Sequence, residues 1–306
     1  MAMGFSEAEV IAVLQEVFAT PDPRIIVGIG DDAAVITGSS QQVISTDMAV
    51  EGVHFKREWS SAFDIGRRIT AANIADVLAM GARCDYLVAA VSLTGSEELS
   101  WIENLARGMK AEADKANAVI VGGDIARAPA ITIAMTAIGS TSHPILRSGA
   151  QIGDGIFLSS LPGWSAAGLH LLTHELATTS EMSKKAISEF RAPTLDYEID
   201  FSSATSLSDI SDSLIVQVTQ MAAASGSSFA LDTELISSAP EFSELNSLAQ
   251  EVNIDVWNWI LGGGEDHVFL ATGANLPGLR IGKIIEGSGI SGLEMKKAPV
   301  SWSHFT

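Results

Sequence analysis

The sequence has a single cysteine, Cys84, in 306 residues, so it forms no intrachain disulfide. Such sparse cysteine use is typical of a reducing cytoplasm, where we expect the protein to reside. No apolar run approaches the roughly 20 residues needed to span a bilayer, and MAMGFSEAEV at residues 1–10 lacks the basic and then apolar order of a signal peptide. These absences predict a soluble, unexported protein. We expect Cys84 to be a buried thiol and not a nucleophile.

Basic residues are also scarce. Lysine and arginine number 18 against 37 aspartates and glutamates, which gives a net charge of −19. This charge argues against nucleic acid and anionic membranes as partners. If the protein handles phosphorylated ligands, divalent metal ions on carboxylates must cancel the repulsion. The alternative is that much of the acidity is a solvated surface that aids solubility.

Several common nucleotide and metal motifs are missing. No G-x-x-x-x-G-K-[ST] sequence occurs, so there is no P-loop. The stretch GIGDDA at residues 28–33 fits the loose dinucleotide pattern, but it precedes an expected strand instead of a helix, and its two aspartates would face the pyrophosphate. His170 and His174 have the spacing of a zinc pair, yet the glutamate of a metalloprotease motif is absent, so a solvated helix face is the better interpretation.

Hydrophobic periodicity predicts an α/β (α+β) protein of two domains. A turn-rich segment, 140–155, contains Pro144 and separates an expected N-terminal domain, 1–140, from a C-terminal domain, 141–306. The polar passage from 191 to 208 is expected to be loop. The expected helices are 6–18, 64–80, 96–116, 165–176, 181–190 and 214–224. The expected strands are 33–36, 43–46, 86–93, 119–121, 131–138, 156–159, 268–271 and 281–285, the last of the chain.

Aspartates recur at the boundaries of these expected elements. Two strands, 33–36 and 43–46, joined by a turn at 38–40, would carry the first of them at their ends. Oxygen ligands without cysteine or paired histidine suit a hard cation, magnesium above zinc, and such ions bind the phosphates of a nucleotide. Asp76 is either a ligand or solvent-facing, and either aspartate of the DISD segment alone is equally well explained as a helix cap. The six aspartates are Asp31, Asp47, Asp76, Asp124, Asp209 and Asp212.

Eight segments in order resemble the thiamine-monophosphate kinase family over nearly the whole chain. That resemblance implies a two-domain fold like that of aminoimidazole-ribonucleotide synthetase, with ATP between the domains and an N-terminal mixed sheet that pairs across a homodimer. The VEGVHF and WSHF pieces favour this family over its relatives. The segments are GDDAA (30–34), STDMAVEGVHF (45–55), ITAANIADVLAMGA (69–82), VGGDIAR (121–127), RSGAQIGDGIF (147–157), DISDSL (209–214), GGEDH (263–267) and WSHF (302–305).

The resemblance also implies roles for individual residues. Asp76 and Arg147 would be catalytic, and ATP would contact Gly123, Arg147 and Ser211. Thiamine monophosphate would contact His54, Glu265 and Trp302. The sequence departs from the family pattern at Ser213, where glycine is usual, and at His267 and Val268, where Tyr-Glu is usual; the segment from Asn73 to Asp76 also lacks a common serine. The implied magnesium ligands are Asp31, Thr46, Asp47, Asp76, Asp124, Asp209 and Asp212.

The implied activity is direct, magnesium-assisted transfer of the ATP γ-phosphoryl group to thiamine monophosphate, which gives thiamine diphosphate. One alternative is a different ATP-dependent enzyme of the superfamily, like aminoimidazole-ribonucleotide synthetase, which activates an amide oxygen. Another is a catalytically silent regulator that binds nucleotide or metal. The absence of a cysteine near the N-terminus argues against selenophosphate synthetase.

Overall fold

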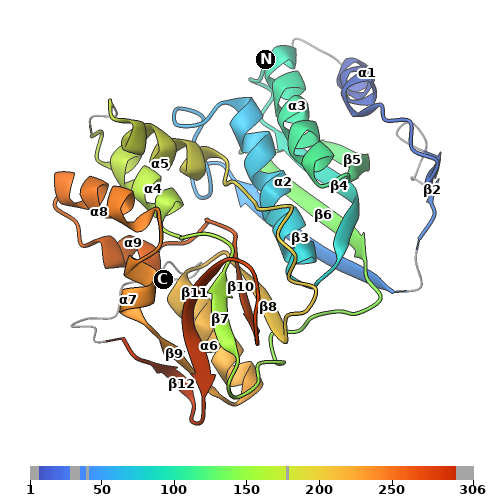
Figure 1. Cartoon of the computed structure of the whole chain (residues 1–306). Helices are drawn as coiled ribbons and strands as arrows, with labels where there is room; N and C mark the ends of the chain where they lie inside the picture. Colours follow the sequence, from blue (N-terminus) through green and yellow to red (C-terminus); the bar gives the residue numbers. More distant parts are fainter. Residues whose placement is uncertain (1–6, 28–34, 39–40, 177–178, 294–306) are drawn as a thin grey trace. The chain divides into compact units, whose positions relative to one another are not determined.

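The computed structural model describes residues 7–27, 35–38, 41–176 and 179–293 (Figure 1). The chain divides into two compact units, 1–78 with 82–143 and 79–81 with 144–306. Each unit has its own sheet and its own helices. In the described ranges no helix is both long enough and apolar enough to cross a membrane.

The first unit is a four-stranded sheet with the strand order β3-β6-β4-β5. All neighbours are antiparallel except β4 and β5, which are parallel and are joined through α3 as a β-α-β crossover. Helices α2 and α3 lie side by side in Figure 1 and cover one face of the sheet. The elements are α1 (Glu7–Phe18), α2 (Ala62–Leu78), α3 (Leu99–Lys115), β3 (Gln42–Val50), β4 (Arg83–Leu93), β5 (Val119–Arg127) and β6 (Thr132–Ser140).

The burial pattern of strand β6 shows that helices cover one face of this sheet. Ile133, Met135 and Ala137 are fully buried, whereas the intervening Thr132, Ala134 and Thr136 are half-buried. This period of two is that of a strand with one face against helices and one face open. The two helices approach closely because a Cβ on Gly66 would lie 2.2 Å from the carbonyl oxygen of Leu105, so only glycine fits there.

The second unit is a six-stranded sheet with the strand order β12-β9-β11-β7-β10-β8, antiparallel except for the β12–β9 pair. Its core brings sheet residues such as Ile156 and Leu270 together with helix residues such as Val218 and Leu245. The strands are β7 (Gly155–Leu158), β8 (Ser206–Ile210), β9 (Ser228–Leu231), β10 (Val268–Gly273), β11 (Leu279–Ile285) and β12 (Gly289–Ser291). The helices are α4 (Trp164–Thr173), α5 (Glu181–Arg191), α6 (Leu214–Ser225), α7 (Thr233–Ser237), α8 (Phe242–Glu251) and α9 (Val256–Gly262).

The expected pairing of 33–36 with 43–46 is wrong. Strand β2 (Val35–Ile36) pairs with β1 (Ile25–Val27) in a separate two-stranded sheet, and β3 pairs with β6 instead. Strand β3 is also longer than expected, so Asp47 lies within it and not at its end. Asp124 likewise lies within β5, because the backbone of Gly122 and Gly123 continues the ladder to β4 and does not end it.

The passage 191–208 ends in a strand that the sequence did not predict. Strand β8 is fully buried although three of its five residues are polar, because hydroxyls pair within the sheet; Ser206 and Thr272 lie 2.9 Å apart at Oγ and Oγ1. Asp209 therefore belongs to β8 and does not open a helix. The expectation that 281–285 is the last strand is wrong too, since β12 follows it.

Candidate active site

In the first unit, strand β3 and helix α2 bring Asp47 and Asp76 into one polar cluster. Ser45 donates a hydrogen bond from Oγ to Oδ2 of Asp76 at 2.6 Å. The backbone N–H of Asp47 donates to Oδ1 of Asn73 at 3.0 Å, and Asn73 is itself fixed by a 2.8 Å bond to the carbonyl oxygen of Ile69. Both carboxylates are half-buried. This oxygen-rich set has the donor chemistry that magnesium prefers.

Asp124 and Gly123 lie at the other edge of this sheet. Asp47 is on β3 and Asp124 on β5, three strand spacings away, which is about 14 Å. The strand register aligns Asp47 with Met135, on the helix-covered face, and aligns Asp124 with Ala134, on the open face. Within one chain these two carboxylates therefore cannot ligate the same ion.

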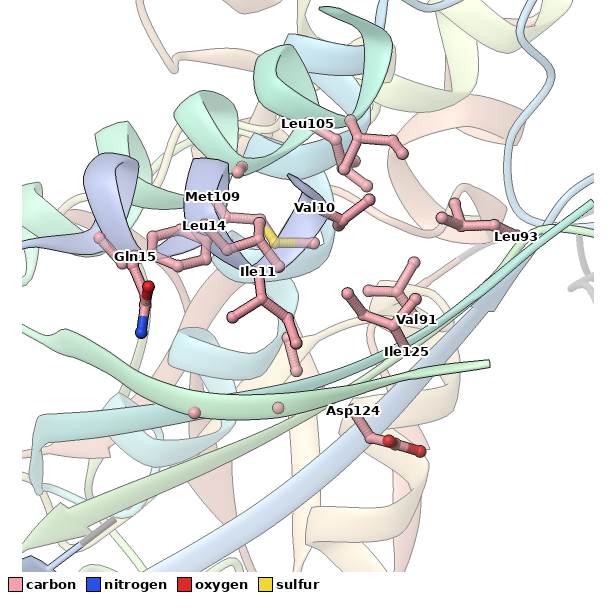
Figure 2. A pocket seen from close by; sticks show the side chains of 16 residues that line it. Val10, Ile11, Leu14, Gln15, Val91, Leu93, Leu105, Met109, Asp124 and Ile125 are labelled. Carbon is pink, nitrogen blue, oxygen red and sulfur yellow. The ribbon is translucent and has the colours of Figure 1, made fainter. Parts of the chain in front are cut away.

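Next to Asp124 lies an apolar cavity of about 660 Å³, which is lined by residues of α1, α3, β4 and β5. Figure 2 shows Val91 and Ile125 pointing into this cavity and the Asp124 side chain pointing away from it. Close packing explains the glycine at 123, because a Cβ there would lie 2.0 Å from the carbonyl oxygen of Ala89.

Thr46, on the open face of β3, donates to the carbonyl oxygen of Met135 at 2.9 Å.

His54 lies in a tight turn directly after β3. Gly52 takes a φ of +84°, a conformation that favours glycine, and the buried Phe55 anchors the end of the turn. The backbone N–H of Val50 donates to Nδ1 of His54 at 3.1 Å. Because Nδ1 accepts this bond, the proton of the neutral ring is on Nε2. His54 thus presents a hydrogen-bond donor half-exposed at the surface of the turn.

In the second unit, Asp209 forms a buried pair with His267. The Nδ1 atom of His267 lies 3.1 Å from Oδ2 of Asp209, and the two side chains are only 3% and 2% exposed. The Nε2 atom of the same ring lies 4.0 Å from Oε2 of Glu265, whose side chain is 40% exposed. The imidazole thus lies between a buried carboxylate and an exposed one.

The loop that carries Glu265 and His267 has a constrained backbone. Glu265 and His267 have φ values of +64° and +51°, which non-glycine residues rarely adopt. Their N–H groups donate to the carbonyl oxygens of Ser211 at 2.6 Å and Ile210 at 3.0 Å. A Cβ on Gly264 would lie 2.5 Å from the carbonyl oxygen of Asp212. The loop is therefore fastened to the end of β8, and strained residues of this kind cluster at functional sites.

Asp266 has a structural role in the same loop. Its two carboxylate oxygens accept hydrogen bonds from the N–H groups of Gly163 at 2.8 Å and Ser165 at 2.9 Å, at the start of α4. Burial raises the pKa of Asp266 to about 6, although the two backbone hydrogen bonds act in the opposite direction. The side chain thus ties the loop to a helix and faces away from solvent.

Ser213 begins helix α6. Its Oγ accepts a hydrogen bond from the N–H of Val216 at 3.2 Å, which is an N-cap. This explains the departure from glycine at that position. It also removes the explanation that Asp209 or Asp212 caps the helix. Asp212 and Ser211 lie just before the cap and are half-buried.

Arg147 is exposed beside α6. Its Nη1 donates to Oε1 of Gln220 at 3.1 Å, and Ser225 donates to its carbonyl oxygen. Gln220 lies about 9 Å along the helix axis from Leu214, where the helix begins. The structure therefore places the Arg147 guanidinium along the side of α6 and not at the acidic start of the helix.

Asp31 and Trp302 lie outside the described residues. Over the ranges that the structure does describe, no group of three or more His, Cys, Asp or Glu side chains could by itself hold a metal ion. His174 is exposed and its Nδ1 lies 2.9 Å from the carbonyl oxygen of His170, in agreement with a surface helix face. Cys84 is buried, and burial raises its pKa to about 12, so it is no nucleophile.

Three polar residues that contact the candidate aspartates were not predicted as site residues from the sequence: Ser45, Asn73 and His267. Ser45 could have been found, since side chains two apart on a strand share a face and Asp47 was already a candidate. Asn73 was noticed only as a neighbour of Asp76 on the helix. His267 was noted only as a departure from a pattern, because its contact with Asp209 joins positions 58 residues apart.

Comparison with known proteins gives matches over most of the chain. Residues 30–141 match the family of AIR synthase related protein, N-terminal domain. A thiamine-monophosphate kinase of Corynebacterium glutamicum is 38% identical over 254 residues, which cover 79% of this chain and 76% of that protein. The crystal structure of thiamine-monophosphate kinase from Stenotrophomonas maltophilia K279a has a TM-score of 0.80 at 28% identity and covers 94% of this chain and 96% of its own.

A second solved structure, of AaThiL complexed with AMPPCP and TMP, has a TM-score of 0.78 at 27% identity over 98% of this chain and 97% of that one. These similarities confirm the expected α/β fold of the aminoimidazole-ribonucleotide synthetase type.

Proposed function

The chain belongs to the thiamine-monophosphate kinase family, and from this membership we propose that it transfers the γ-phosphoryl group of ATP to thiamine monophosphate, giving thiamine diphosphate and ADP. The observation that carries the proposal is the placement of Asp47 and Asp76 on regular elements, where Ser45 donates to the Asp76 carboxylate and Asn73 accepts the backbone N–H of Asp47. Carboxylates on regular elements can bind the magnesium ions that accompany nucleotide phosphates. Both aspartates lie in segments that resemble the family.

The acceptor simplifies the chemistry. A phosphate monoester has a second pKa near 6, so at neutral pH its oxygen is already an ionised nucleophile and no general base is required. The barrier is the approach of two anions, and what the protein must supply is alignment and positive charge. We assign Arg147 to neutralise charge on the phosphates, since its guanidinium is exposed and is not engaged by a carboxylate in the described residues.

Magnesium is the proposed metal, and its chemistry would be to neutralise and align the phosphates. Asp47, Asp76 and Asp212 fit it as half-buried carboxylates, the first two on β3 and α2 and the third just before α6. Asp124 would belong to a different ion from Asp47, because the sheet separates them. The proposed ligands are Asp31, Thr46, Asp47, Asp76, Asp124, Asp209 and Asp212.

Two described residues are proposed to contact thiamine monophosphate. His54 lies half-buried on a turn that Gly52 and Phe55 hold, and Glu265 lies on a fastened loop with its side chain 40% exposed. Trp302 is proposed as a third contact by analogy with the family alone. For ATP the proposed contacts are Gly123, Arg147 and Ser211.

The experiment is an assay of the purified protein with ATP, Mg²⁺ and thiamine monophosphate, in which thiamine diphosphate and ADP are separated by chromatography. Parallel reactions replace the acceptor with an amide substrate of the aminoimidazole-ribonucleotide synthetase type. We expect thiamine diphosphate and ADP in equal amounts, only with Mg²⁺. ADP formed only with the amide acceptor, or tight ATP binding with no ADP from either acceptor, would contradict the proposal.

A homodimer is the proposed assembly, formed through the open face of the N-terminal sheet. Ile44 and Met48 of β3 lie on this face with 64% and 57% of their surface exposed, an unusual exposure for large apolar side chains in a strand. The acidic surface elsewhere would resist non-specific association. Sedimentation velocity should give twice the chain mass of 32.1 kDa. An Ile44→Asp, Met48→Asp variant should sediment as a monomer, and a monomeric native protein would overturn the proposal.

The N-terminal unit is accordingly proposed as the ATP, magnesium and dimerisation domain, in the range 1–140, with 141–306 as the C-terminal domain. A reducing cytoplasm is the proposed setting, since Cys84 is the only cysteine of the sequence.

A further inference from the structure

The His267 ring is the link between two carboxylates of the second unit. Asp209 is buried, and its Oδ2 lies 3.1 Å from Nδ1. A buried carboxylate is costly unless a donor faces it, and Nδ1–H is such a donor. The bond engages Oδ2 of Asp209. Glu265, on the opposite side of the ring, lies 4.0 Å from Nε2.

The backbone around His267 leaves the ring little freedom. Its own N–H is bonded to the carbonyl oxygen of Ile210, next to Asp209 on β8. The backbone N–H of Phe269 donates to Oγ of Ser159 at 3.0 Å, and this bond holds the strand that follows. The left-handed φ of His267 directs a non-glycine side chain into the buried space beside β8. The loop is thus built to place an imidazole against Asp209.

We propose that His267 is a positioning residue, which fixes the orientation of the Asp209 carboxylate for magnesium. This inference rests on the proposed function, since it assigns Asp209 to the metal. Neighbouring groups that orient a metal ligand typically change metal affinity or activity by about 10–100-fold when they are removed. His267 acts through Asp209 and touches no reacting atom.

Two substitutions separate the roles of the two ring nitrogens. The amide of His267→Asn places an N–H donor near the position of Nδ1, so the bond to Asp209 is kept. The amide of His267→Gln reaches the position of Nε2 and leaves Asp209 without its donor. His174→Gln makes the same change at an exposed histidine of the same unit and is the matched control.

The first readout is the binding of the non-hydrolysable ATP analogue AMPPCP by calorimetry over a series of Mg²⁺ concentrations. We expect the Mg²⁺ concentration for half-maximal binding to rise about tenfold in His267→Gln, and to stay within about threefold of the native value in His267→Asn and His174→Gln. The second readout is the initial rate over the same Mg²⁺ series, which should shift in His267→Gln by the same factor while the KM for thiamine monophosphate at saturating Mg²⁺ stays near the native value.

A folded His267→Gln with native Mg²⁺ dependence would overturn the proposal, and so would a His267→Asn that is impaired as strongly as His267→Gln. If His267→Gln does not fold, native Mg²⁺ dependence in His267→Asn supports the proposal and a tenfold loss contradicts it. Failure of the function looks different, because then the native protein forms no thiamine diphosphate while AMPPCP binding still distinguishes the variants.

Discussion

The two acidic regions of the molecule are built in different ways. In the first unit, Asp47 and Asp76 are half-buried on a strand and a helix; Ser45 donates to the Asp76 carboxylate, and Asn73 accepts the backbone N–H of Asp47. In the second unit, Asp209 is buried against His267, and the loop beside it has left-handed backbone at two non-glycine residues. Regular elements thus suffice for the first region. The second needs an irregular loop that is fastened by hydrogen bonds on both sides.

The comparison indicates which substitutions should change activity without changing stability. A half-exposed carboxylate remains partly hydrated in the folded state, so its loss should affect activity more than stability. A buried carboxylate, in contrast, is part of the packed structure, and removing it or its donor leaves an unsatisfied group.

The largest effect is expected for Asp76→Asn. The change removes the charge that would face the metal and keeps the shape of the side chain. Turnover of thiamine monophosphate should fall by roughly a thousandfold or more, since metal-assisted charge stabilisation is worth several kcal/mol. The melting temperature should stay close to the native value. Steady-state kinetics and thermal unfolding measure the two quantities.

Asp114→Asn is the control for this variant, because Asp114 is an exposed residue of α3 that pairs with Lys110 at the helix surface. Near-native magnesium-dependent activity in Asp76→Asn would remove the first region from the active site.

A smaller effect is expected for Ser45→Ala, which deletes the 2.6 Å hydrogen bond to Asp76 and leaves the carboxylate in place. The Mg²⁺ concentration for half-maximal activity should rise about tenfold while kcat at saturating Mg²⁺ changes less. A Mg²⁺ titration of the initial rate tests this. An unchanged titration curve would mean that Asp76 does not need Ser45 for its orientation.

The smallest effect on activity is expected for Asp266→Asn, which changes how stability depends on pH in the second region. Burial raises the pKa of Asp266 from an ordinary 3.8 to about 6 in the folded protein, so the folded state binds the proton more tightly than the unfolded state. The stability from this group is fully present below about pH 4 and is lost as the pH rises through 6. The loss amounts to at most about 3 kcal/mol.

Urea unfolding of the native protein and of Asp266→Asn at several pH values measures this difference. The native protein should lose stability relative to the variant between pH 4 and pH 7. A difference that does not change with pH would show that Asp266 is ionised throughout that range.

Local sequence patterns predicted the regular parts of both regions well. The helix that carries Asp76 was expected from its apolar spacing, and the helix that begins at Leu214 ends at Gly226, which adopts a left-handed φ of +62° as expected of a C-terminal glycine. These features depend on residues within a few positions of one another, so a single sequence contains the information.

The parts that were missed depend on contacts between distant segments. The sequence of strand β8 is typical of a polar loop, because the partner of the Ser206 hydroxyl is Thr272, far along the chain. The separation of Asp47 from Asp124 depends on the strand order, which no local pattern specifies. For the same reason, the motifs identified the candidate site residues but not the side chains that orient them.

The central claim is direct transfer of a phosphoryl group from ATP to thiamine monophosphate, and the most direct measurement traces the γ-phosphate of ATP into the products. The native protein is mixed with ATP labelled in the γ-phosphate, Mg²⁺ and thiamine monophosphate, and the labelled products are separated over a single turnover. We predict that all transferred label appears in thiamine diphosphate, one for each ADP, and that a magnesium chelator stops the reaction. Release of the label as inorganic phosphate without labelled thiamine diphosphate would contradict the account.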